Sequence, residues 1–285
     1  MVYTMKNLSV IDTRTLFRKN TDELIILLKS LSREQWLSST CYPEWKVKDI
    51  AAHLLQSGLN RLSRQRDGFP TDGPLPPLGF EDILEIVSSG NDHWQEMFSS
   101  ISPELIISLL ELSEYNLCCL FEELPLNGQA VFSVAWAGET ISENWFDIAR
   151  EWTERWHHHQ QIREAIGAGP LTQPEYLRPV IDTLIRAVPW WYSEIPAEDG
   201  TQVHIEITGE SGGLWTLLSE DNNWLLKSGF PETGGDAGIR LSQDTAWRFL
   251  TRTIGPSEAA GSITFSGNLE LAENFLHVKA IMMSD

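Results

Sequence analysis

The hydrophobic pattern of this chain changes at residues 167–170, where the run Gly-Ala-Gly-Pro separates two kinds of sequence. Before this run, apolar residues recur at spacings of three and four, as they do in amphipathic helices. After it, apolar and polar residues alternate in several short segments, which is typical of half-buried strands. The length of 285 residues is enough for two domains of ordinary size. We therefore expect a two-domain α+β protein, with a helical domain at 1–170 and a domain of helices and strands at 171–285.

The first domain is predicted to be an up-and-down helical bundle. Its one long loop is expected near 66–80, which is dense in Gly and Pro. Ser32, followed three residues later by Gln35, indicates a capping box at the start of a short helix. The longer helices are predicted at 15–31, 47–62, 81–99, 103–123 and 142–165.

The second domain is predicted to be a mainly antiparallel sheet with helices packed on it. Alternation predicts strands at 203–207, 214–218, 224–227, 238–241 and 263–265. Helical periodicity predicts helices at 176–192, 244–253 and 269–279.

Charge and cysteine content exclude several classes of protein. A formal net charge of −19 argues against a nucleic-acid partner, because phosphate binding needs clustered Lys and Arg. Cys41, Cys118 and Cys119 are an odd set with two adjacent members, so we expect no disulfide framework and a reducing compartment. No apolar run approaches the length of a membrane span. We expect a cytoplasmic protein that binds neither nucleic acid nor membranes.

The residues most suited to chemistry lie in two of the predicted helices. Glu154 and His158 are four apart, so on a helix they point the same way and can share one ion. A solvated polar face explains this pair equally well. His53 lies at the edge of the apolar side of 47–62, where a histidine is usually a satisfied core residue. His157 can pair with Glu154, and His159 is expected to be packed or hydrogen-bonded on the opposite side.

Both segments resemble the mycothiol-dependent maleylpyruvate isomerase family. Residues 45–54 are similar to the helix that supplies the family's first metal-ligating histidine, and residues 154–167 are similar to the helix in which a Glu and a His complete the triad. The resemblance implies that His53, Glu154 and His158 are metal ligands. It also implies a DinB-like helical bundle followed by a C-terminal domain similar to sterol carrier proteins.

Cofactor and substrate classes follow from the same resemblance. Two imidazoles and a carboxylate suit zinc, with nickel, cobalt or iron as alternatives. A low-molecular-weight thiol is the implied cosubstrate, and a small electrophile or unsaturated dicarboxylate is the implied substrate. Gln161 departs from the family pattern, in which many members have an acidic residue three positions after the last ligand. This difference leaves the identity of the thiol and of the substrate open.

The resemblance further implies an arginine of the C-terminal domain that holds the anionic group of the substrate. Arg248 and Arg252 lie four apart on the predicted helix 244–253, and Arg252 is our candidate. A solvated pair of helical arginines is the competing interpretation.

Two other functions fit the same residues. One is a non-catalytic protein that binds a metal or an apolar ligand, in which His93 or His157 closes the coordination sphere as a fourth ligand. The other is a hydrolase that uses a metal-activated water and needs no thiol.

Overall fold

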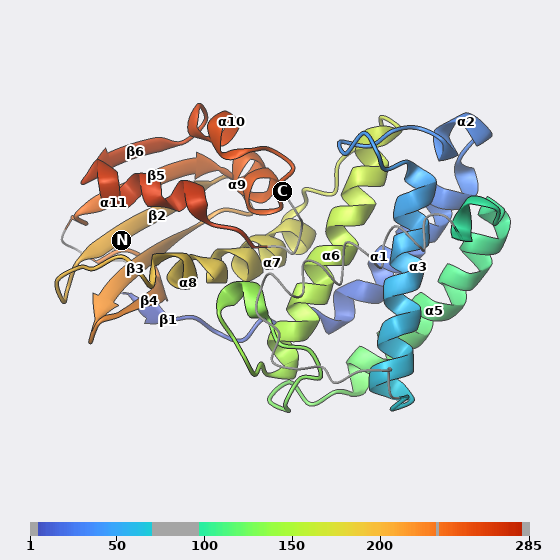
Figure 1. Ribbon diagram of the computed structural model, residues 1–285, viewed down its shortest axis with the longest axis horizontal. Coiled ribbons are helices and arrows are strands. Elements are labelled where there is room, and N and C mark those ends of the chain that lie inside the picture. Colours follow the sequence, from blue (N-terminus) through green and yellow to red (C-terminus); the bar gives the residue numbers. More distant parts are fainter. Residues whose placement is uncertain (1–4, 70–96, 232–233, 281–285) are drawn as a thin grey trace. The chain divides into compact units, whose positions relative to one another are not determined.

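The computed structural model describes residues 5–69, 97–231 and 234–280 of an α+β protein (Figure 1). The chain packs as two compact units. The helical unit is built from residues within 12–133 and 140–171. The sheet unit is built from residues within 1–11, 134–139 and 172–281, so a piece of the first half of the sequence packs with the second.

Helices that bury apolar side chains against one another make up the helical unit. They are α1 (Arg14–Ser30), α2 (Arg33–Trp36), α3 (Val47–Arg61), which continues into a π-helical turn at Leu62–Arg66, α5 (Pro103–Glu123) and α6 (Asn144–Ala165). Helix α5 packs against α1 and α3, and α6 packs against the same two helices. The predicted capping box is confirmed, since the Ser32 hydroxyl accepts from the backbone N–H of Gln35 and the Gln35 side chain accepts from that of Ser32. Most of the predicted helix 81–99 lies outside the described residues.

Within its described residues, the sheet unit contains a mixed sheet of six strands in the order β1-β4-β3-β2-β5-β6. All neighbours are antiparallel except β2 and β5, which run parallel. Asp221 and Asn222 both have positive φ values, 52° and 59°, which suits the tight hairpin turn between β3 and β4. The strands are β1 (Lys6–Asn7), β2 (Gln202–Thr208), β3 (Gly213–Glu220), β4 (Asn223–Ser228), β5 (Ala237–Ser242) and β6 (Thr264–Gly267). The sequence did not predict β1, because two exposed residues carry no alternation.

The helices of this unit are shorter than their periodicity predicts. The predicted helix 176–192 is divided into α7 (Pro174–Leu184), a 3-10 turn at Ile185–Ala187 and α8 (Val188–Tyr192). Pro189 lies in the first turn of α8, where its missing N–H is tolerated, whereas inside a longer helix it would remove a hydrogen bond. The prediction of one helix over 269–279 is also wrong, because α11 (Leu269–Glu273) gives way to a 3-10 turn at Asn274–His277. The remaining pieces are a 3-10 turn at Ala135–Ala137, α9 (Gln243–Leu250) and α10 (Pro256–Ala260).

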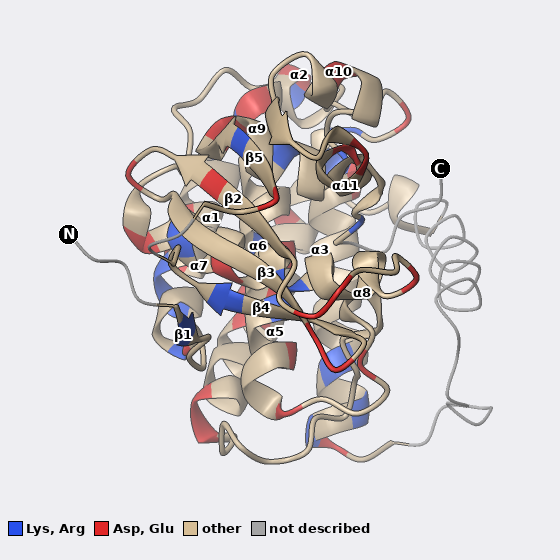
Figure 2. Ribbon diagram, turned by 90° about the vertical axis from the view of Figure 1, so that its left-hand side faces the viewer, with Lys and Arg blue, Asp and Glu red and all other residues tan. Residues whose placement is uncertain are grey.

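Acidic side chains occur throughout both units. Figure 2 shows them on helices, strands and loops, interspersed with the less numerous basic residues, in keeping with 40 acidic against 21 basic side chains in the sequence. Within the described residues, no helix is long and apolar enough to cross a membrane.

Candidate metal centre

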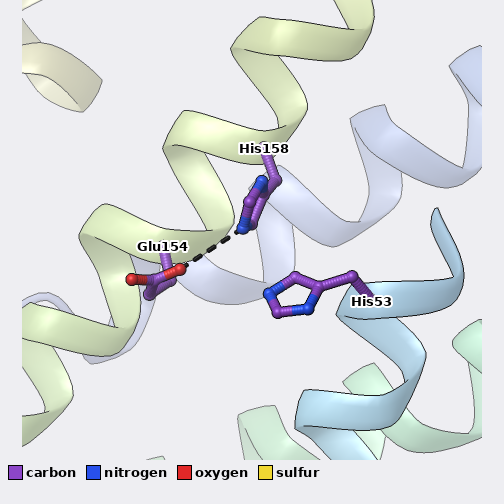
Figure 3. A group of neighbouring side chains, drawn as sticks. All are labelled: His53, Glu154 and His158. Atoms are coloured by element: carbon purple, nitrogen blue, oxygen red, sulfur yellow. Dashed lines mark ion pairs between the residues drawn. The ribbon is translucent and has the colours of Figure 1, made fainter. Parts of the chain in front are cut away.

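Three side chains of the helical unit converge in the space between α3 and α6. His53 comes from α3, while Glu154 and His158 lie one turn apart on α6. Figure 3 shows the three side chains pointing toward one another, and one potential ligand atom from each lies within 4.8 Å of the other two. The structure therefore brings together all three residues that the sequence predicts as metal ligands.

Helix α3 holds His53 at the border of the apolar core. The helix begins at Val47, and the backbone N–H of the preceding Lys46 donates to the Asp49 carboxylate at 2.9 Å. Ile50 and Leu54 are buried, which leaves the intervening His53 half-buried beside them. The indole of Trp45 meets the imidazole of His53 edge-on, with ring centroids 5.3 Å apart. Packing on both sides therefore sets the position of the His53 ring.

Helix α6 is anchored by tryptophans on the side away from its candidate ligands. Trp152 and Trp156 are fully buried, and the Trp156 indole N–H donates to the carbonyl of Leu171 at 2.8 Å. Residues two positions apart on a helix differ by about 200° in direction. Glu154 and His158 therefore point away from the tryptophans and toward α3.

A buried network of ion pairs fixes how α3 and α6 lie against each other. Arg61 donates to both carboxylate oxygens of Asp147, at 2.6 and 2.9 Å, and to Glu151 at 2.8 Å. Arg150 donates to the same two carboxylates at 2.7 and 2.6 Å. Arg155 donates to Glu151 at 2.6 Å. The arginines outweigh burial and hold the pKa of Glu151 well below its ordinary value.

The same network reaches α5 through Glu114. This carboxylate lies 3.3 Å from Arg155, and both side chains are almost completely buried. Burial dominates here and raises the pKa of Glu114. The network was not predicted from the sequence, although its signal was present in the acidic and basic residues spaced three and four apart on α6.

The local charges also set the ionisation of Glu154. Burial acts to raise the pKa of its carboxyl group, but the adjacent His158 and the positive charges that His158, His53 and Arg150 can carry outweigh burial and lower the pKa to about 2. Glu154 is therefore a carboxylate throughout the physiological pH range, as a metal ligand must be.

Both ring nitrogens of His158 have a polar neighbour. Its Nε2 lies 3.3 Å from the Glu154 carboxylate, and its Nδ1 lies 2.7 Å from the side-chain oxygen of Gln161. The amide nitrogen of Gln161 donates in turn to the sulfur of Cys41 at 3.7 Å. These contacts of Gln161, which departs from the pattern of the family that the sequence resembles, were not predicted from the sequence.

The other histidines of this region lie outside the cluster. His157 is buried and stacks on His158 with ring centroids 5.6 Å apart, but it is not in the group of converging ligand atoms. The expectation for His159 is confirmed, since it is completely buried and its Nδ1 lies 2.9 Å from the side-chain oxygen of Asn20. Burial lowers the pKa of His159 to about 3, so it is neutral. His93 lies outside the described residues.

The two candidate arginines belong to the sheet unit. Arg248 pairs with Asp244 one turn earlier on α9 at 3.0 Å, and its guanidinium lies over the Trp247 ring. Arg252 follows the end of α9 in a left-handed conformation, with φ of 58°. The structure therefore gives Arg248 a local partner on its own helix, while a role for Arg252 toward an anion stays a prediction.

The chemistry of the cluster fits a transition-metal ion. Ligand atoms at about 2.1 Å from a tetrahedral ion are about 3.4 Å from each other. The distance of 3.3 Å between His158 Nε2 and Glu154 Oε2 corresponds to such an edge. Two imidazoles and one carboxylate suit zinc, nickel, cobalt or iron. Among the described residues, the group consists of His53, Glu154 and His158 and includes no fourth His, Cys, Asp or Glu.

Comparisons with known proteins give limited similarity. No protein-family model and no curated protein matches the sequence. Among solved structures, the chain is similar to a mycothiol-dependent maleylpyruvate isomerase, with 13% identity and a TM-score of 0.49 over 91% of this chain and 93% of that one. A histidine-to-alanine mutant described under the same name gives 12% identity and a TM-score of 0.46 over the same shares.

A third solved structure, the inverting sec-alkylsulfatase Pisa1 from Pseudomonas sp., gives 10% identity and a TM-score of 0.23 over 82% of this chain and 44% of that one. All three TM-scores are below 0.5. The assignment of the site therefore rests on the geometry and chemistry of its own residues.

Proposed function

We propose that this protein is a metal- and thiol-dependent enzyme, an isomerase or S-transferase that acts on a small unsaturated electrophile. The observation that carries the proposal is the cluster of His53, Glu154 and His158, whose ligand atoms lie within 4.8 Å of one another. Three ligands and an open position are typical of catalytic metal sites, whereas structural sites are closed by four. The resemblance of residues 45–54 and 154–167 to the mycothiol-dependent maleylpyruvate isomerase family supports a thiol as the cosubstrate.

The charges around the site favour an anionic ligand at the open position. Arg61, Arg150 and Arg155 are matched in formal charge by three carboxylates, Glu114, Asp147 and Glu151. A divalent ion held by Glu154 and two neutral imidazoles keeps one net positive charge. A thiolate would neutralise that charge, and a bound ion would supply the Lewis acidity that favours the thiolate over the thiol.

The partial exposure of the cluster gives a small molecule access to it. Glu154 and His158 keep 32% and 13% of their side-chain surface exposed, so the cluster is not sealed inside the core. Behind it, Ile50 and Leu54 are fully buried, and they exclude water from that side. The helices hold the ligands in place, because the ion pairs of Arg61 connect the C-terminal end of α3 to α6.

The proposed reaction needs no redox change. The thiolate sulfur adds to one carbon of a conjugated double bond, and the electron pair of that bond moves onto the adjacent carbonyl. The former double bond is then single and rotates. Loss of the same sulfur restores the double bond in the other geometry and returns the thiolate, while transfer of a proton to the adduct instead gives a thioether, the product of an S-transferase.

The test is a turnover assay of the full chain with zinc, with cobalt and after metal removal. Mycothiol and glutathione are the thiols to compare, each with a cis-unsaturated dicarboxylate and with an aryl halide electrophile. We expect turnover that requires both metal and thiol and is lost in His158→Ala. His277→Ala, which removes an exposed histidine of the sheet unit, is the matched control and keeps full activity.

Two results would replace the proposal with one of the other functions. Hydrolysis of a simple ester or amide that depends on metal but not on thiol would make the protein a metal-assisted hydrolase. Stoichiometric metal binding without turnover of any substrate in the panel would make it a binding protein.

A further inference from the structure

The buried side chain of Gln161 contacts His158, one of the candidate metal ligands. Its side-chain oxygen lies 2.7 Å from Nδ1 of His158, on the ring edge away from Glu154. Only 3% of Gln161 is exposed, so water does not compete for this contact. The position is that of a side chain that orients a ligand rather than one that binds the ion itself.

The amide of Gln161 is oriented by its second contact. Its nitrogen donates to the sulfur of Cys41 at 3.7 Å, which directs the carbonyl oxygen toward His158. An amide oxygen only accepts hydrogen bonds, so the proton of a neutral His158 ring lies on Nδ1. The lone pair of the ring then lies on Nε2, the atom that faces Glu154.

With the proton on Nδ1, the Nε2 atom of His158 is able to bind a cation. Nε2 of His158 and the Glu154 carboxylate are then two acceptors 3.3 Å apart, which repel each other unless a positive charge lies between them. With the amide reversed, the Gln161 nitrogen would donate to Nδ1, and Nε2 would carry the proton and donate to Glu154. That arrangement satisfies the pair internally and blocks the metal-binding nitrogen.

We propose that Gln161 is a positioning residue that holds His158 in the Nδ1–H tautomer and so keeps Nε2 available as a ligand. This inference rests on the metal site of the proposed function. It adds that, in the metal-free protein, an uncharged side chain determines whether Nε2 of His158 is unprotonated and able to bind an ion.

The experiment compares the full chain with Gln161→Met, which keeps the volume but removes the acceptor, and Gln161→Glu, which keeps an acceptor. Nitrogen-15 NMR of the metal-free proteins at pH 9, well above the ordinary histidine pKa of about 6.5, reports which ring nitrogen of His158 is protonated. Zinc affinity is measured by competition with a chromophoric chelator, and circular dichroism checks that each variant is folded.

We expect the Nδ1–H tautomer in the unmodified chain and in Gln161→Glu, and loss of that preference in Gln161→Met. Zinc affinity is expected to fall about 10–100-fold in Gln161→Met and to recover in Gln161→Glu. An Nε2–H tautomer in the unmodified chain would overturn the inference, as would an unchanged tautomer and zinc affinity in Gln161→Met. Absence of zinc binding in every protein would refute the metal site, while the NMR result would still decide the role of Gln161.

Discussion

Arg61, the last residue of α3, donates two hydrogen bonds, of 2.6 and 2.9 Å, to the carboxylate of Asp147 in the first turn of α6. Both side chains are almost completely buried, with 3% and 1% of their surface exposed. A bidentate pair of this kind is strongly directional. It fixes one end of the contact between the helices that carry His53 and His158.

Removing Arg61 is expected to destabilise the protein strongly. In Arg61→Met, Asp147 and Glu151 lose a buried partner, and an uncompensated buried charge costs about 3–5 kcal/mol. The free energy of unfolding in urea, followed by tryptophan fluorescence, measures the loss. Lys29→Met is the control, because the Lys29–Glu111 pair is as short, at 2.5 Å, but exposed, and such pairs contribute about 0–1 kcal/mol. Equal losses in the two variants would contradict the account of the buried network.

Zinc is expected to stabilise the chain against unfolding. An ion that binds only the folded state adds about 2.7 kcal/mol at a concentration of 100 times its dissociation constant. The increase arises because the ion ties α3 to α6, so His53→Ala, which leaves α6 intact, is expected to abolish it. Thermal unfolding at rising zinc concentrations gives the measurement. A shift of the same size in His53→Ala would place the stabilising zinc elsewhere.

Cys118 is expected to be a poor nucleophile in the folded chain. Burial raises the pKa of its thiol to about 11, so at pH 8 the thiolate is roughly one part in a thousand. Because only the thiolate reacts, alkylation should speed up about tenfold for each pH unit until the pH reaches that pKa. Mass spectrometry of a variant that keeps Cys118 alone follows the rate, and a variant that keeps the exposed Cys119 alone is the comparison. Equal rates at pH 8 would contradict the burial of Cys118.

The periodicity of the sequence predicted which segments form helices and strands better than it predicted where these elements end or which elements they pack against. The apolar spacing of α1, α3, α5 and α6 placed these helices to within a few residues, because packing on the core demands that spacing. Helix 176–192 was predicted as one piece because its apolar spacing continues through Pro189. The two-residue strand β1 depends on pairing with β4 at Ser228 and Lys227, a distant contact that no local pattern contains.

The candidate ligands could be named from the sequence, whereas their surroundings could not. Glu154 and His158 share a helical face, so one spacing places them together, and His53 came from the resemblance of its segment. The contacts of Arg61 with Asp147, of Arg155 with Glu114 and of Gln161 with Cys41 join different elements. Such contacts depend on how the helices pack, which the sequence periodicity leaves undetermined.

The central claim is that His53, Glu154 and His158 bind a metal ion. Its most direct test is the metal content of the full chain, purified without an affinity tag and measured by elemental mass spectrometry. His53→Ala, Glu154→Ala and His158→Ala are compared with the unmodified chain and with His277→Ala. We predict about one transition-metal ion per chain in the last two proteins and almost none in the three ligand variants. The same metal content in all five proteins would contradict the assignment of His53, Glu154 and His158 as the metal site.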